Sequence, residues 1–132
     1  MNLKRIEQTY SDYKKAVERL KEALEEDIAV NKVAVDAVIQ RFEFTFELSW
    51  KLAKIILAYN GVEVTLPRLI IKEAFKMKMI NNGQAWIDML EDRNKTSHIY
   101  DEDEALEIYE KIRTGHFKML KSFEKSVKNF MK

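Results

Sequence analysis

Apolar residues recur at alternating spacings of three and four along the first part of the chain. Such a spacing places side chains on one narrow stripe of an α-helix, and it predicts a helix over about residues 3–26. A polar stretch, EEDIAVN, follows as a connection, because consecutive glutamates oppose the dipole at a helix C-terminus. The stripe consists of Leu3, Ile6, Tyr10, Tyr13, Val17, Leu20 and Leu24.

A second helix is predicted over about residues 32–59, where apolar residues fall on more than one face. Within it, the segment FEFTFEL alternates with period two, as a strand would. We interpret it as helix, because the run contains no turn residues and strong helix formers flank it. Gly61 stands where a left-handed C-cap belongs. A helix that is apolar on several sides is typical of the centre of a bundle.

The second half of the chain predicts three further helices. Pro67 suits the first turn of a short helix ending near Met79, and the next helix covers about residues 84–94. Asp101 is the expected N-cap of a last helix that reaches about Phe130, with Glu104 at the third helical position. The core stripe of that helix is Ala105, Tyr109, Ile112, His116, Leu120, Phe123, Val127 and Phe130.

Composition supports an all-α class. The 132 residues are 46% apolar and include only three Gly and one Pro, too few turn residues for a many-stranded sandwich or barrel. We therefore expect one domain over residues 1–132, folded as an up-and-down bundle of four principal helices plus a short extra helix.

Charge and cysteine content exclude several functional classes. The formal net charge is only +1, so no global field attracts nucleic acid or a membrane, and any such binding must be local. The chain has no Cys, no Gly-rich phosphate loop and no HExxH motif. Its apolar runs are far shorter than the roughly 20 residues that span a bilayer, and its start lacks an apolar signal region. We expect a soluble cytoplasmic protein with no membrane partner, metal or cofactor.

Candidate chemistry is concentrated in the segment EDRNKTSHIYDE. Arg93 and His98 would lie about 140° apart on a continuous helix, so the helix must end between them if they are to act together. An extended chain after Ser97 would turn His98 and Tyr100 to the same side. An imidazole near neutral pKa and a guanidinium suit RNA cleavage, in which the 2′-hydroxyl is an internal nucleophile.

The leaving group of such a reaction also needs an acid. The other histidine, His116, is expected on the core seam of the last helix, far along the chain from His98. A second copy of His98 from a symmetry-related subunit is the more economical acid. This mechanism predicts a two-fold homodimer with a composite site.

Several alternatives stay open on the residues alone. Arg93 could simply pair with Glu91, Asp92 or the acidic DEDE turn, which would leave His98 and Tyr100 as ordinary loop residues.

On the second helix, Arg41, Glu43 and Glu47 could line a site, although local pairing is favoured because Lys51 is four residues beyond Glu47. Aromatic residues of that helix are expected in the core or a dimer interface rather than in a base-stacking platform; they are Phe42, Phe44, Phe46 and Trp50. Trp86 and Met89 lie one turn apart just before the motif and should pack the motif helix against the bundle.

Three segments resemble the nucleotidyltransferase substrate-binding family, a branch of the HEPN superfamily. They are RFEFTFELSWK (residues 41–51), IKEAFK (residues 71–76) and AWIDMLEDRNKTSHIYDE (residues 85–102). The resemblance implies a small helical bundle that dimerises and is encoded beside a minimal nucleotidyltransferase. The two proteins would form a toxin-antitoxin module.

The resemblance also assigns roles to the motif residues. The Arg-x4-His motif of HEPN ribonucleases falls on Arg93 and His98, with Asn94 as the polar residue that commonly follows the Arg, and Tyr100 completes the extended form Arg-x4-His-x-Tyr. It implies that Arg93 stabilises the transition state of RNA cleavage, that His98 is the general base or acid, and that Asn94 orients the phosphate or His98. Tyr100 would receive AMP from ATP through the partner enzyme, which silences the ribonuclease. The alternative is a non-catalytic substrate-binding subunit of a two-component nucleotidyltransferase.

Overall fold

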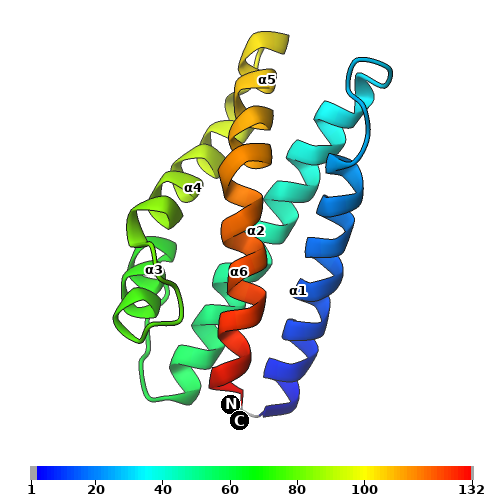
Figure 1. Ribbon diagram of the computed structural model, residues 1–132. Coiled ribbons are helices and arrows are strands. Elements are labelled where there is room, and N and C mark those ends of the chain that lie inside the picture. Colours follow the sequence, from blue (N-terminus) through cyan, green and yellow to red (C-terminus); the bar gives the residue numbers. More distant parts are fainter. Residues whose placement is uncertain (1–2, 132) are drawn as a thin grey trace.

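The computed structural model describes residues 3–131, and within that range it consists of helices without strands (Figure 1). Helices α1 and α2 are long and antiparallel, the shorter α3 and α4 follow, and α5 and α6 return along the bundle. The all-α prediction is confirmed. The bounds are α1 Leu3–Leu24, α2 Val33–Tyr59, α3 Pro67–Lys76, α4 Gly83–Lys95, α5 Glu102–Lys111 and α6 Phe117–Val127.

Helix α2 is the centre of the bundle, because α1, α3, α4, α5 and α6 all pack against it. The FEFTFEL segment is helical, as predicted. Phe42 and Phe46 lie one turn apart and are fully buried, whereas Phe44 points away and is 60% exposed. The helix ends at Tyr59, and Gly61 follows two residues later with a φ of 85°, in the left-handed region that glycine adopts without steric cost.

Side-chain caps mark the starts of two helices near the motif. The side chain of Asn82 accepts a hydrogen bond from the Ala85 N–H at 3.0 Å, at the start of α4. Asp101 accepts from the Glu104 N–H at 2.8 Å, which confirms the predicted N-cap of the last helix. The α4–α5 connection between these caps lies at the end of the bundle that also holds the α1–α2 connection, opposite the two termini (Figure 1).

The last helix contains a π turn that the sequence pattern did not predict. It covers Ile112–His116, between α5 and α6, and a 3₁₀ turn, Lys128–Phe130, follows α6. The Thr114 hydroxyl donates to the Glu110 carbonyl at 2.7 Å, a side-chain bond of the kind that bends helices. The expected core stripe is nevertheless buried from Ala105 to Val127, and Phe130 is half-buried.

None of the helices in residues 3–131 combines the length and the apolar character that crossing a membrane requires.

Tyr13 joins α1 to α6 inside the core. Its side chain is fully buried, and its hydroxyl donates to the Leu120 carbonyl at 2.5 Å. The centre of its ring lies 5.5 Å from the centre of the Phe123 ring, and the two rings are nearly perpendicular. Burial raises the pKa of Tyr13 well above its ordinary value of 10.0, and the nearby charge of Glu124 raises it further.

Tyr13 should therefore make the protein sensitive to alkali. Above about pH 10 the phenol ionises in the unfolded chain but stays protonated in the folded one, so unfolding becomes more favourable by up to about 1.4 kcal/mol per pH unit. Denaturant unfolding from pH 8 to 11 should show a steeper fall in the free energy of unfolding for the wild type than for Tyr13→Phe. The exposed Tyr59→Phe is the control and should match the wild type. Parallel curves for wild type and Tyr13→Phe would contradict this assignment.

Candidate functional site

The motif residues lie where α4 ends. Helix α4 stops at Lys95, a 3₁₀ turn covers Thr96–His98, and Ile99 is extended. The predicted break between Arg93 and His98 is therefore confirmed. The hydroxyl of Thr96 lies 2.6 Å from the Arg93 carbonyl, and Ser97 donates to the Asn94 carbonyl at 3.2 Å. In a continuing helix, backbone N–H groups would donate hydrogen bonds to these two carbonyls. Here the side-chain hydroxyls lie at hydrogen-bonding distance from them instead.

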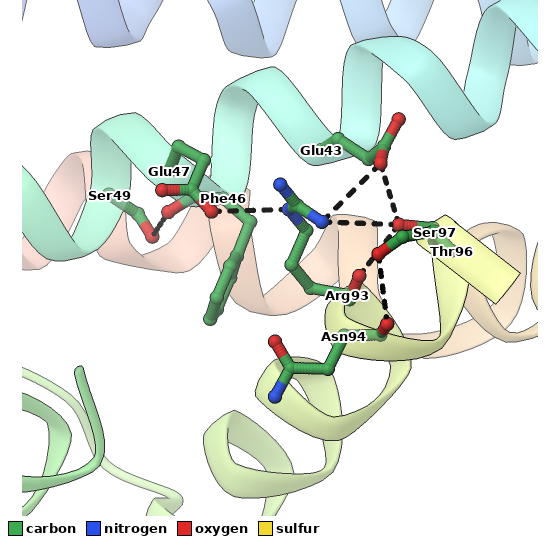
Figure 2. Close-up of polar contacts among 8 residues, drawn as sticks. All are labelled: Glu43, Phe46, Glu47, Ser49, Arg93, Asn94, Thr96 and Ser97. Atoms are coloured by element: carbon green, nitrogen blue, oxygen red, sulfur yellow. Dashed lines mark hydrogen bonds and ion pairs between the residues drawn. The ribbon is translucent and has the colours of Figure 1, made fainter.

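The Arg93 guanidinium is held by two carboxylates of α2 (Figure 2). Its Nε donates to Glu47 Oε1 at 3.1 Å, and its Nη1 lies 3.4 Å from Glu43 Oε2. The same Nη1 lies 3.3 Å from the Thr96 hydroxyl, which in turn is 2.6 Å from Glu43 Oε2. One edge of the guanidinium is thereby fixed against α2, and about a quarter of the side chain remains exposed.

These contacts correct the local pairings considered from the sequence. Arg93 does not pair with Glu91, Asp92 or the acidic turn before α5, but with residues about 50 positions earlier in the chain. Glu47 pairs with Arg93 rather than with Lys51, whose ammonium lies 5.9 Å from the centre of the Trp50 ring. The spacing of Glu43 and Glu47 showed that they share a helix face, but it could not show which helix meets that face.

His98 lines a pocket of about 400 Å³ between the end of α4 and α5. Asn94 lines the same pocket, so the structure brings these two motif residues together. Arg93 is not among the lining residues, because it turns toward α2, and Tyr100 is 82% exposed outside the pocket. The remaining lining is mixed in charge and consists of Lys95, Ile99, Glu104, Glu107, Ile108 and Lys111.

The second histidine is buried, as its position on the core stripe predicted. His116 is 8% exposed, stacks on the Phe42 ring with centres 5.4 Å apart, and places Nε2 at 2.7 Å from Asp92 Oδ2. It does not line the His98 pocket. No motif or spacing in the sequence indicated this contact between His116 and Asp92, the residue before Arg93.

Burial and hydrogen bonds place three further residues that the sequence pattern singled out. Trp86 and Met89 are buried in the core, as expected of the helix that carries the motif. Arg41 donates to the Arg19 carbonyl of α1 at 2.7 Å, so it does not join the Arg93 cluster. Across residues 3–131, three or more His, Asp or Glu side chains do not come together in an arrangement that could hold a metal ion.

The family comparison covers nearly the whole chain. Residues 8–129 match the model of the family described as nucleotidyltransferase substrate binding protein like. A curated relative from Haemophilus influenzae, named probable ribonuclease HepT, is 31% identical over 88 residues. That match covers 63% of this chain but only 60% of the relative.

Two solved structures resemble the whole fold. A protein from Thermus thermophilus has a TM-score of 0.74 and 28% identity, over 91% of this chain and 98% of the other. A Haemophilus influenzae protein, described as showing the fold of a substrate binding domain of a nucleotidyltransferase, has a TM-score of 0.68 and 22% identity, over 96% of this chain and 99% of the other. The resemblance drawn from the three sequence segments is thus confirmed, and this chain belongs to the family of proteins like the nucleotidyltransferase substrate-binding proteins.

Proposed function

We propose that this chain is a HEPN-type endoribonuclease toxin that works with a minimal nucleotidyltransferase encoded by the adjacent gene. The observation that carries the proposal is the complete Arg-x4-His-x-Tyr motif at the break after α4, with Asn94 and His98 lining one accessible pocket. The relative named probable ribonuclease HepT supports it over the matched segment. The toxin would act on RNA in the cytoplasm.

His98 and Arg93 divide the chemistry of RNA cleavage between them. The His98 imidazole takes the proton of the 2′-hydroxyl, whose oxygen then forms a bond to phosphorus while the bond to the 5′-oxygen breaks. The guanidinium of Arg93 stabilises the negative charge that gathers on the phosphoryl oxygens. Asn94 orients the phosphate or His98 from the same pocket.

The contacts of Arg93 leave donors for a phosphate. Glu43, Glu47 and Thr96 occupy Nε and Nη1, whereas Nη2 has no hydrogen-bond partner in the part of the chain that the structure describes. The two carboxylates also offset the guanidinium charge. Further attraction for the RNA backbone is available from Lys95 and Lys111, which line the His98 pocket.

A homodimer supplies the acid that one chain lacks. The 5′-oxygen must receive a proton as it leaves, and His116 is buried against Asp92, away from the His98 pocket. A two-fold axis beside the motif would bring a second His98 to the same phosphate. One imidazole then acts as base and the other as acid.

Tyr100 is the proposed modification site. Its side chain is 82% exposed, so its hydroxyl is open to a partner enzyme. The phenolic oxygen attacks the α-phosphorus of ATP, its proton is lost, and pyrophosphate leaves. The added AMP places bulk and negative charge beside the motif, where both oppose binding of an RNA phosphate.

A second candidate function is a non-catalytic substrate-binding subunit for the nucleotidyltransferase. The description of the matching family favours it, and it requires no hydrolysis. In that function the motif would contribute to recognition within the two-protein complex. The two candidates differ in whether the isolated chain cleaves RNA.

Loss of either central motif residue should abolish toxicity. Arg93→Ala removes the cation at phosphorus and His98→Ala removes the proton acceptor, so each should end growth inhibition and reduce RNA cleavage by at least about 100-fold. Both variants should remain folded and dimeric by circular dichroism and light scattering, since the Arg93 ion pairs are partly exposed and weak. Arg41→Ala, an arginine of α2 outside the cluster, is the matched control. A fully toxic Arg93→Ala or His98→Ala would refute the assignment.

Modification should depend on Tyr100 alone. Intact-mass spectrometry after incubation with ATP, Mg²⁺ and the neighbouring nucleotidyltransferase should show added AMP units on the wild type and none on Tyr100→Phe. Tyr59→Phe, which changes another exposed tyrosine, should be modified like the wild type. A stable complex without any mass addition would favour the substrate-binding subunit instead.

A further inference from the structure

The residue before Arg93 is a buried carboxylate with both oxygens engaged. Asp92 is 3% exposed. Its Oδ2 lies 2.7 Å from His116 Nε2, and its Oδ1 lies 3.3 Å from Lys111 Nζ. Because a carboxylate oxygen only accepts, Nε2 is the ring nitrogen that carries the proton. This buried contact joins the last turn of α4 to the junction of α5 and α6.

The π turn of Ile112–His116 explains how both partners reach Asp92. Lys111 and His116 are five residues apart, and on a regular α-helix their side chains would diverge by about 140°. In a π turn the hydrogen bonds run between residues five apart, so these positions lie nearly above one another. The irregular turn therefore aligns an ammonium and an imidazole on the one carboxylate.

Asp92 and Arg93 hold α4 from two sides. Consecutive residues of an α-helix point about 100° apart. Asp92 faces the α5–α6 junction, while Arg93 faces Glu43 and Glu47 of α2. Two contacts in different directions fix the rotation of this turn about its axis, and thus the direction of the guanidinium and of the Asn94 side chain that follows it.

We propose that Lys111 and His116, both joined to the buried carboxylate of Asp92, form with it an anchor that positions Arg93 and Asn94 for an RNA phosphate. The catalytic part of this inference rests on the proposed ribonuclease function. Asp92 and His116 are positioning residues that do not touch the substrate, whereas Lys111 is part-exposed and also lines the His98 pocket. Stability alone would be a poor reason for the cluster, because apolar side chains of similar volume commonly stabilise a core as well as a buried ion pair does.

Two substitutions remove the anchor with little change in volume. Asp92→Asn replaces one of the two acceptor oxygens with an NH2 group, which cannot accept a hydrogen bond from Lys111 or His116. His116→Phe keeps a ring stacked on Phe42 but removes the donor. The matched control is Tyr13→Phe, which removes another buried hydrogen bond, between α1 and α6, outside the motif.

The first readout is the Arg93 Nε–H cross peak in ¹H–¹⁵N NMR spectra, assigned by its absence in Arg93→Lys. The bond to Glu47 should hold this signal at a distinct position in the wild type and in Tyr13→Phe. In Asp92→Asn and His116→Phe the peak should shift to the position of free arginines or be lost. An unchanged peak in either folded anchor variant would overturn the proposal.

The second readout is the steady-state cleavage of RNA at a temperature where circular dichroism shows each variant folded. Misplacement of Arg93 should lower kcat by about 10- to 100-fold with KM unchanged. Tyr13→Phe should keep the wild-type kcat, and Asp92→Asn should retain more activity than Asp92→Ala. Wild-type kcat in Asp92→Asn would overturn the anchor. Failure of the wild type to cleave RNA would instead refute the ribonuclease function, and the Arg93 peak would still decide the anchor.

Discussion

The packing of five other helices against α2 is the constraint on which the rest of the structure depends. Five other helices pack against this one helix, so its apolar residues set where each of them lies. Polar side chains of α2 that are partly buried by these helices then have fixed positions in the bundle. Glu43 and Glu47 are such side chains, because the helix that carries them cannot rotate without exposing Phe42 and Phe46.

The motif gains its geometry from this frame. Helix α4 rests against α2 through its apolar side chains, and Arg93 at its last turn meets the two glutamates. The α5–α6 junction contacts the next face of the same turn through Asp92. The short 3₁₀ turn then places His98 at the pocket beside α5. A guanidinium held by two ion pairs and an accessible imidazole fit the roles of charge-stabilising residue and proton acceptor that we propose for Arg93 and His98.

Local features of the fold could be predicted from the sequence, and contacts between distant segments could not. Gly61, Asp101 and the helix break before His98 were predicted because each depends on a few neighbouring residues. The pairing of Arg93 with Glu43 and Glu47 was not, because it depends on how two helices rotate and slide against each other. The π turn was missed for a related reason: its neighbours keep an ordinary apolar spacing, and only the backbone shows the extra residue.

Whether this chain cleaves RNA by attack of the 2′-hydroxyl is the central claim. The most direct measurement incubates the purified protein, without its partner, with a labelled RNA in excess EDTA and analyses the ends of the products. The account predicts cleavage in EDTA with 2′,3′-cyclic phosphate ends, because the nucleophile belongs to the RNA and the proton acceptor to the protein. Intact RNA, or cleavage that appears only when Mg²⁺ is added, would contradict it.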